Sequence, residues 1–327
     1  MMHAPKFWRQ GGNPVLPALL SPISAIVAGA TARRMAQDGW RAPVPVICCG
    51  NLTVGGAGKT TVALDLVARL LTQGRRVHVL LRGYGGSSRG VHRVGVDDPA
   101  SLVGDEARLL AAMAPTWIGG DRAASARAAI AAGAEALVMD DGLQNPTLRK
   151  SLSLMVIDGG YGFGNRRVMP AGPLRETVAT GAARCHAAIL IGADETGVEP
   201  LLPRDLPVLR AALVPGDEIT GFIGRHVLAF AGIATPEKFF RGLEDAGVLV
   251  VERRPFPDHH RFTHRELAKI ISDAKILDAR VVTTPKDAAR IAPAMPTGID
   301  VIGVRLEWQN PVALDQLLAS VWNGSAR

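Results

Sequence analysis

The sequence is poor in aromatic residues and in cysteine, and both shortages restrict the kind of protein that it encodes. Aromatic residues make up 5% of the 327-residue chain, whereas hydrophobic residues make up 47% and glycines number 36. This balance disfavours a β-sandwich and an intrinsically disordered chain, and it suits helices packed closely on a parallel sheet. The three cysteines, Cys48, Cys49 and Cys185, match neither a disulfide framework nor the spacing of zinc ligands. A reducing cytosol is the compartment that fits best.

Negative charge is also scarce relative to positive charge. Lys and Arg total 37 against 30 Asp and Glu, which gives a formal net charge of +7 at pH 7. Such a surface attracts anions, although the charge alone does not choose among phosphates, nucleic acid and an acidic membrane face. At this length we expect one large α/β domain or two domains.

A stretch without formal charge lies near the N-terminus, from residue 10 to residue 32. A membrane span needs about 20 predominantly apolar residues, and this stretch is diluted by serines and by three prolines. Basic residues flank it, with Lys6 and Arg9 before it and Arg33 and Arg34 after it. The pattern favours a helix that lies in the membrane interface. The alternative is a helix packed on the protein's own core, whereas a cleavable signal peptide is disfavoured because the glycine-rich stretch "GGAGKTT", typical of intracellular nucleotide loops, follows at 55–61.

Apolar strand patterns alternate with helical patterns along the rest of the chain. A strand is predicted in 43–50, followed by a glycine-rich turn and a helix in 60–74; a second strand is predicted in 75–86. Further helices are predicted in 104–115 and 124–133, and buried strands in 134–145, 151–165 and 186–195. This order predicts an α/β fold with a doubly wound, mostly parallel sheet, and the G-K-T at 58–60, between the first strand and the first helix, indicates the P-loop type.

The pattern restarts at about residue 221 with shorter strands and helices, which predicts a second, smaller α/β domain. We therefore divide the chain into an N-terminal membrane-associating segment (1–40), a P-loop core domain (41–220) and a smaller lid domain (221–327). The last helix either stays with the lid or packs back on the core.

The stretch "NLTVGGAGKTT", at 51–61, nearly matches the phosphate-binding loop G-x-x-x-x-G-K-[ST], but Thr53 stands where the first glycine is expected. Its glycines leave room for backbone N–H groups to face phosphate oxygens, Lys59 can reach the β- and γ-phosphates, and the Thr60 hydroxyl can ligate Mg²⁺. The alternative is a glycine turn that binds nothing. The predicted nucleotide contacts are Thr53, Val54, Gly55, Gly56, Ala57, Gly58, Lys59, Thr60 and Thr61.

A Mg²⁺ site also needs an acidic group at the tip of a neighbouring strand, and "LVMDDG" supplies Asp140 and Asp141 there. The alternative is a solvated strand end. A phosphoryl transferase further needs a group that orients or deprotonates its acceptor. Candidates in polar loops are Asp105, Glu106, Asp158, Asp258, His259 and His260, and spacing alone does not pair residues so far apart in sequence.

Nine motifs together resemble one known family. They are "GNLTVGGAGKTT", "LLRGYGG", "GDEA", "DRAASA", "MDDGLQN", "DGGYGFGNRRVMPAGPLRE", "FAGIATPEKFF", "FPDHHRFT" and "TTPKDAARI". In this order they resemble tetraacyldisaccharide 4'-kinases, the lipid A 4'-kinases of Gram-negative bacteria. The family's own loop resembles G-N-x-[ST]-x-G-G-x-G-K-T, so Thr53 is expected within it.

The resemblance implies a role for each matching residue. Asp105 is implied to be the catalytic base, and His259 its partner from the second domain, together with Lys59. Arg82, Arg122 and Gln144 are implied to contact phosphate or substrate. Thr60, Asp140 and Asp141, with Glu106 and Glu176, are implied to lie around the metal. The chain departs from the family at Leu143 and Asn145, where an aromatic residue and a histidine are common, and His260 beside His259 leaves open which imidazole faces the base.

The implied activity is transfer of the γ-phosphate of ATP, with Mg²⁺, to the 4'-hydroxyl of a tetraacylated glucosamine disaccharide 1-phosphate, giving lipid IVA. The implied partners are this lipid and the cytoplasmic surface of the inner membrane, and no nucleic acid. A lipid acceptor also strengthens the interfacial interpretation of the N-terminal segment. The alternative is a P-loop regulatory or metal-insertion GTPase, but the N-K-x-D segment typical of guanine selectivity is absent from the sequence.

Overall fold

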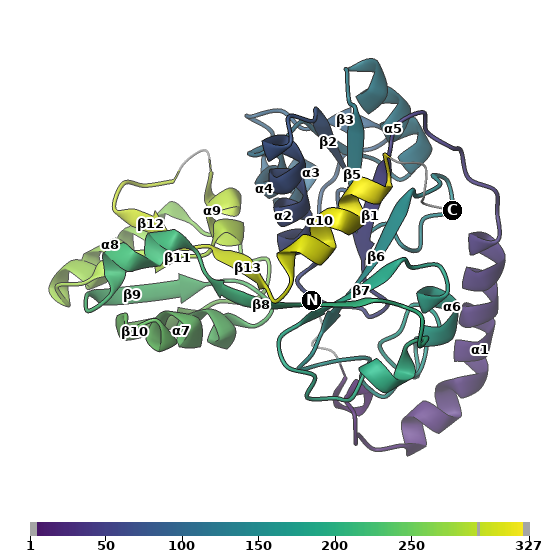
Figure 1. Cartoon of the computed structure of the whole chain (residues 1–327). Coiled ribbons are helices and arrows are strands. Elements are labelled where there is room, and N and C mark those ends of the chain that lie inside the picture. The colour runs from purple at the N-terminus through teal and green to yellow at the C-terminus, as the bar shows by residue number, and fades with distance from the viewer. Residues whose placement is uncertain (1–4, 293–294, 323–327) are drawn as a thin grey trace.

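The computed structural model describes residues 5–292 and 295–322, and a nine-stranded sheet forms the centre of its larger part (Figure 1). The strand order is β13-β8-β7-β6-β1-β5-β2-β4-β3. Only the two outermost pairs, β13 with β8 and β3 with β4, are antiparallel among the described strands. The strands are β1 (Val46–Gly50), β2 (Val77–Leu81), β3 (His92–Arg93), β4 (Thr116–Ile118), β5 (Ala136–Asp140), β6 (Leu152–Asp158), β7 (Ala187–Ile191), β8 (Val208–Pro215) and β13 (Val304–Trp308).

Helices cover both faces of this sheet, and each face has its own apolar core. One core joins the sheet to α2 (Lys59–Thr72), α3 (Ala100–Val103), α4 (Asp105–Ala111) and α10 (Pro311–Ser320). The other joins it to α5 (Arg122–Ala131), α6 (Val178–Ala182) and part of α1 (Val15–Met35). The central strands β1, β2, β5 and β7 are buried along their whole length, as expected for a parallel sheet covered on both faces. The predicted P-loop α/β fold class is confirmed.

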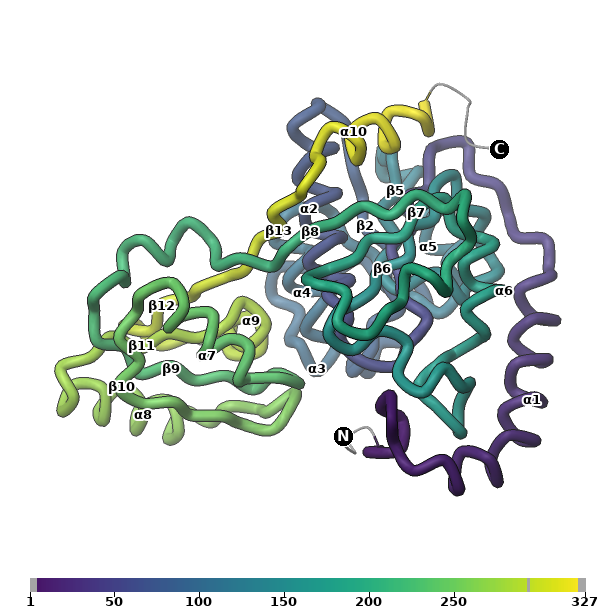
Figure 2. The backbone as a smooth tube through the Cα atoms, turned by 60° about the horizontal axis from the view of Figure 1, so that its bottom comes forward, coloured from purple at the N-terminus to yellow at the C-terminus, as the bar shows by residue number. Residues whose placement is uncertain are grey.

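A second, four-stranded sheet lies beside the first (Figures 1 and 2). Its strands are all parallel, in the order β10-β9-β11-β12. They are β9 (His226–Ala231), β10 (Leu249–Pro255), β11 (Arg280–Thr283) and β12 (Ile299–Val301), and the helices are α7 (Pro236–Asp245), α8 (His264–Ile276) and α9 (Pro285–Ile291). The chain enters this part after β8 and leaves it before β13, which returns to the large sheet. Leu314 and Leu318 of α10 then pack into the core of the large sheet.

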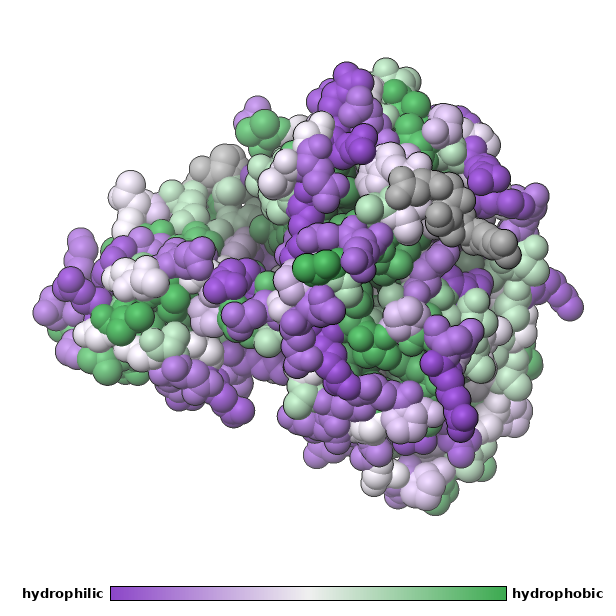
Figure 3. Space-filling view, viewed as in Figure 1, coloured by the Kyte–Doolittle hydropathy of each residue, from purple (hydrophilic) through white to green (hydrophobic). Residues whose placement is uncertain are grey.

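Helix α1 runs along the outer margin of the large part and is long and apolar enough to cross a membrane by length and composition. It contacts the rest of the chain through a few groups, among them the Ser24 hydroxyl, which accepts a hydrogen bond from the Ala171 amide at 3.1 Å. Its large apolar side chains are mostly exposed, with Leu19 at 71% and Ile26 at 73%. In the space-filling view the margin occupied by α1 is largely pale green and white (Figure 3). The helix therefore uses little of its apolar surface for the protein's own core.

Candidate active site

The glycine-rich loop connects β1 to α2, with Gly58 as the N-cap of the helix. Gly55 and Gly58 have φ values of 121° and 80°, a conformation that side chains disfavour. A Cβ at Gly58 would lie 2.7 Å from the Ile191 methyl group, whereas the space beside Gly55 and Gly56 is open to 4 Å. The loop therefore presents its backbone at the N-terminus of α2, where helix N–H groups and the dipole favour an anion.

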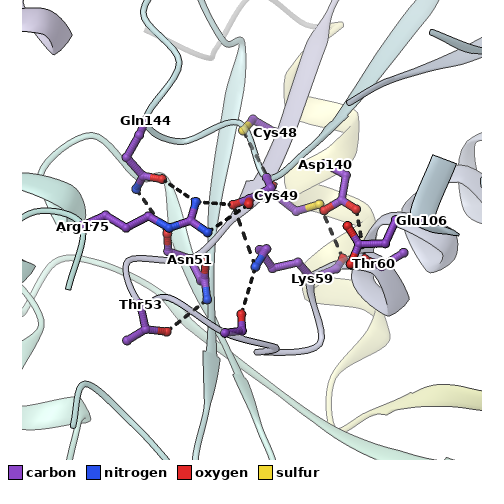
Figure 4. Close-up of polar contacts among 12 residues, drawn as sticks. Cys48, Cys49, Asn51, Thr53, Lys59, Thr60, Glu106, Asp140, Gln144 and Arg175 are labelled. Atoms are coloured by element: carbon purple, nitrogen blue, oxygen red, sulfur yellow. Dashed lines mark hydrogen bonds and ion pairs between the residues drawn. The ribbon is translucent and has the colours of Figure 1, made fainter. Parts of the chain in front are cut away.

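Thr53 stands where the general motif has its first glycine, and its contacts hold the start of the loop in place. Its side chain is buried, and its hydroxyl accepts a hydrogen bond from Asn51 Nδ2 at 3.0 Å (Figure 4). It forms an isolated bridge with Leu174, and the amide of Val54 donates to the Pro173 carbonyl at 2.8 Å. The threonine thus ties the loop entrance to the segment before Arg175.

Thr60 and Asp140 meet at the end of β5. The Thr60 hydroxyl donates to Asp140 Oδ2 at 3.1 Å, and Asp140 is 2% exposed (Figure 4). Burial, and then the charge of Glu106, raise the pKa of Asp140 to about 7, although Lys59 opposes the shift. The other carboxylate oxygen, Oδ1, is buried and has no hydrogen-bond partner among the described residues. A buried carboxylate with a free oxygen beside a threonine hydroxyl fits a hydrated Mg²⁺ ion.

Within the described residues, no group of three or more His, Cys, Asp and Glu side chains is arranged as a metal centre. The remaining ligands of a Mg²⁺ ion would therefore come from water and nucleotide phosphates, which is usual for Mg²⁺ in nucleotide sites.

Asp141 lies between two cations. Arg175 donates to both of its carboxylate oxygens, at 2.8 and 3.0 Å, and Lys59 Nζ lies 3.9 Å from Oδ1. Burial opposes ionisation, but Lys59 and Arg175 hold the pKa of Asp141 below its usual range. Its backbone has a φ of 52°, which is uncommon for a residue other than glycine. The strained turn and the two cations together fix one ionised carboxylate beside the phosphate loop.

Gln144 and Glu176 are hydrogen-bonded to each other, and Gln144 also contacts Arg175, the partner of Asp141. Gln144 Nε2 donates to Glu176 Oε1 at 2.9 Å and to the Asn51 carbonyl at 3.2 Å, and its oxygen accepts from Arg175. Glu176 is buried and forms an ion pair with Arg184 at 2.7 Å. In this arrangement both side chains hold Arg175 and the loop in place, and the predicted substrate contact of Gln144 and metal contact of Glu176 stay predictions.

The first turn of α4 meets the second sheet. His259 Nδ1 lies 2.7 Å from Asp105 Oδ2, and Arg290 Nε of α9 donates to the same oxygen at 2.6 Å. Burial opposes ionisation of Asp105, but His259 and Arg290 lower its pKa, and the hydrogen bond to Asp105 raises the pKa of His259. His259 also has a positive φ, 60°. The two side chains form an acid–base pair that joins the two parts of the molecule.

The neighbouring His260 turns away from this pair. Its Nε2 lies 3.1 Å from Glu266 Oε1, and its ring stacks on Phe256 and meets Phe262 edge-on. Of the two histidines, His259 is the one that faces Asp105.

Comparison with known proteins decides the family. The profile of the family described as LpxK, tetraacyldisaccharide-1-P 4'-kinase, matches residues 16–323. The chain belongs to this family.

The similarity extends over almost the whole length of individual relatives. The chain is 55% identical over 322 residues to the tetraacyldisaccharide 4'-kinase of Gluconacetobacter diazotrophicus, with 97% of each chain covered. It is 51% identical to that of Rhodospirillum centenum, with 99% of this chain and 98% of the relative covered. Its fold is similar to that in the crystal structure of "apo" form LpxK from Aquifex aeolicus in complex with ATP, with a TM-score of 0.75, 25% identity, and 94% and 99% of the two chains covered.

The structure places the remaining predicted residues of this LpxK family member around the same sheet edge. Arg122 is 2% exposed, burial lowers its pKa to about 10, and its Nε is buried without a hydrogen-bond partner among the described residues. Arg82 is exposed and close enough for its charge to act on Arg122. Asp158 is the last residue of β6, and Lys238 of α7, from the smaller part, donates to it at 3.0 Å.

Two arginines of the site had no role in the sequence analysis. Arg175 stands in the quoted stretch "PLRE" and Arg290 in "TTPKDAARI", but their partners, Asp141 and Asp105, lie 34 and 185 residues away in the sequence. The only available signal was the position of each arginine inside a motif, which does not identify the partner.

Proposed function

We propose that this protein is an ATP-dependent lipid kinase that phosphorylates the 4'-hydroxyl of a tetraacylated glucosamine disaccharide 1-phosphate. The observation that carries the proposal is one sheet edge that holds a phosphate loop, two strand-end aspartates and an Asp–His pair, in a chain of the tetraacyldisaccharide 4'-kinase family. A carboxylate that can take a proton suits a hydroxyl acceptor or water, and membership of the kinase family favours the hydroxyl acceptor.

The loop side of the site would bind the triphosphate. The N–H groups of 55–60 would face the phosphates, and Lys59, which contacts the Gly55 carbonyl and Asp141, would reach the γ-phosphate. Thr60 and Asp140 would hold Mg²⁺, which when bound neutralises charge that develops on the transferred phosphoryl group. Because Asp140 is buried, the negative charge of its carboxylate is poorly solvated, and its attraction to a cation is therefore strong.

The Asp–His pair would activate the acceptor. Asp105 Oδ2 accepts from Arg290 and contacts His259, while Oδ1, for which the described residues provide no hydrogen bond, would accept the proton of the sugar hydroxyl. As that proton moves to the carboxylate, the sugar oxygen forms a bond to the γ-phosphorus and the bond to the leaving ADP oxygen breaks. His259 stabilises the arrangement by holding the carboxylate in one orientation, as the third member of a hydrogen-bonded triad does.

The N-terminal helix would place the enzyme on the cytoplasmic face of the inner membrane. Val15, Leu19, Ile23 and Ile26 recur at helical spacing and are all exposed, and Arg33 and Arg34 follow in the last turn. An apolar face next to basic residues fits an anionic bilayer surface, where the lipid acceptor resides.

A transfer assay tests the proposal. Purified protein is incubated with γ-labelled ATP and tetraacyldisaccharide 1-phosphate in detergent micelles, and Lys59→Met protein serves as the inactive control. We expect label on the lipid with the wild type and almost none with the variant. Hydrolysis of GTP without labelled lipid would overturn the kinase proposal in favour of a GTPase.

A further inference from the structure

Arg290 is a buried cation in the interface between the two sheets. The binding of phosphate by the glycine-rich loop and the transfer of a proton to Asp105 do not explain why a cation is buried there. Its side chain is 6% exposed, although it belongs to the short helix α9 of the smaller part. A guanidinium removed from water needs several hydrogen-bond acceptors to offset the lost hydration. Its partners lie on both sides of the interface.

Within the smaller part, Arg290 is held by Asp287, whose two carboxylate oxygens both accept hydrogen bonds. Asp287, fully buried, accepts from Arg290 Nη1 at 2.7 Å through Oδ1. Its Oδ2 accepts from the Thr284 hydroxyl at 2.7 Å and from the Gly232 amide at 3.0 Å. The Gly232 carbonyl in turn accepts from Arg290 Nη1 and, at 3.1 Å, from the His259 amide. Arg290 and the backbone of His259 are therefore anchored to the same glycine at the end of β9.

On the other side, Arg290 reaches the large sheet's helix α4. Its Nε donates to Asp105 Oδ2 at 2.6 Å, and its Nη2 lies 3.4 Å from His259 Nδ1. One turn earlier in α9, Lys286 Nζ lies 3.0 Å from Glu106 Oε1. Two adjacent acidic residues at the start of α4 are thus contacted by two basic residues at i and i+4 of α9. The guanidinium fork fixes both the distance and the angle of the contact to Asp105, whereas an ammonium group would fix only the distance.

We propose that Arg290 is a positioning residue that aligns Asp105 with His259 only when α9 lies against α4. Among its contacts with the described residues, Arg290 reaches Asp105 only through Oδ2 and does not reach the nucleotide loop, so it acts through the carboxylate that it orients. The inference rests on the proposed kinase function, because alignment of the pair matters only if Asp105 receives a proton from an acceptor.

The experiment compares Arg290→Met and Arg290→Lys with the control Arg254→Met in the full-length protein. Arg254 is a well-paired arginine of the same small sheet, bonded to Asp273 at 2.6 Å and Glu252 at 2.7 Å, away from α4. Initial rates of lipid labelling are measured over ranges of ATP and lipid concentration, and thermal unfolding reports on folding.

We expect Arg290→Met to lower kcat on the order of 100-fold with an unchanged KM for ATP, because a misplacement of about 1 Å of a reacting group has effects of this size. Arg290→Lys is expected to recover part of the loss, and Arg254→Met to retain the wild-type kcat. Equal kcat values for Arg290→Met and Arg254→Met would overturn the inference. An increase in the KM for ATP with unchanged kcat would also overturn it.

If Arg290→Met does not fold, the double variant Arg290→Met/Asp287→Asn removes the buried carboxylate that is left without a cation. The same loss of kcat is expected from it, and a wild-type kcat would overturn the inference. A wild-type enzyme that labels no lipid contradicts the proposed function itself, which separates that failure from a failure of the role of Arg290.

Discussion

His259 Nδ1 and Asp105 Oδ2 lie 2.7 Å apart, although the two residues are separated by 154 positions, Asp105 at the start of α4 beside the large sheet and His259 in the loop after β10 of the smaller sheet. The contact forms because the loop after β10 places His259 in a left-handed conformation, bonded to the end of β9, while α4 begins at Asp105. A residue other than glycine in this conformation is strained, and such strain is concentrated at functional sites. The two parts of the molecule therefore meet through a pair of titratable groups.

The first prediction separates the two adjacent histidines. His259→Gln is expected to lower kcat by about 10²–10⁴, the range for loss of general acid–base assistance, with little change in the KM for ATP. His260→Gln, the matched control, is expected to retain most of the activity because His260 contacts Glu266 and two phenylalanine rings. Steady-state rates of lipid labelling measure both, and a larger loss from His260→Gln would show that the assignment of the pair is wrong.

The second prediction concerns the charge on the phosphate loop. Lys59→Met keeps the length of the side chain but removes the cation that lies between the loop and Asp141. We expect kcat to fall by at least about 10²-fold, as it does when one electrostatic contact to a transition state is lost. Arg69→Met, in the same helix but paired with Asp65 and Asp315, is the control. Single-turnover rates at saturating ATP measure the effect, and an unchanged rate for Lys59→Met would remove the loop from the mechanism.

The third prediction concerns the exposed face of α1. Leu19→Glu/Ile23→Glu/Ile26→Glu replaces three exposed apolar side chains. Burial of one such side chain contributes about 1.5–3 kcal/mol, so binding to vesicles that contain anionic phospholipid is expected to fall by at least about 100-fold. Sedimentation with these vesicles measures the binding, while labelling of substrate in detergent micelles is expected to persist.

Ile276→Glu is the control for this change, because Ile276 is 80% exposed but lies at the end of α8 in the smaller part. If the α1 variant and the Ile276 variant bind vesicles equally well, α1 is not the membrane-binding face.

The fourth prediction is a pH dependence of stability that arises far from the reacting groups. His78 is buried in β2, its Nδ1 accepts a hydrogen bond from Trp117 Nε1 at 3.2 Å, and burial and then Arg93 lower its pKa. Because the folded protein favours the neutral imidazole, its contribution to stability is complete above the unfolded pKa of about 6.5 and is lost as the pH falls through the lower pKa of the folded state.

Urea unfolding between pH 5 and pH 8 tests this prediction with His78→Gln, whose amide oxygen can still accept from Trp117. The wild type is expected to lose more stability than the variant as the pH falls below about 6.5. Parallel losses in the two proteins would show that another group is responsible.

Local patterns were sufficient to predict the α/β class, because the buried strands β1, β2, β5, β6 and β7 are apolar runs and α2 carries apolar residues at helical spacing. The predicted strand in 43–50 and helix in 60–74 correspond to β1 and α2, and the aspartates after 136–139 lie at the tip of β5. The phosphate loop was predictable for the same reason, since its function depends on consecutive residues.

Contacts between distant segments were not predictable from such patterns. The antiparallel return of β13 to β8 depends on which sheet edge is available, and the sequence of β13 does not encode that information. The ion pairs of Arg175 with Asp141 and of Arg290 with Asp105 likewise depend on how loops and sheets are placed. The family resemblance supplied the pair of Asp105 with a histidine, but only the structure places His259, and not His260, beside it.

The position of the phosphate in the product tests the proposed kinase activity most directly. Wild-type protein is incubated with ATP, Mg²⁺ and tetraacyldisaccharide 1-phosphate, and the lipid is analysed by tandem mass spectrometry. We expect one added phosphate, on the 4'-oxygen of the distal glucosamine, and its loss in the Asp105→Asn variant. Release of inorganic phosphate with an unmodified lipid, or an added phosphate at another oxygen, would contradict it.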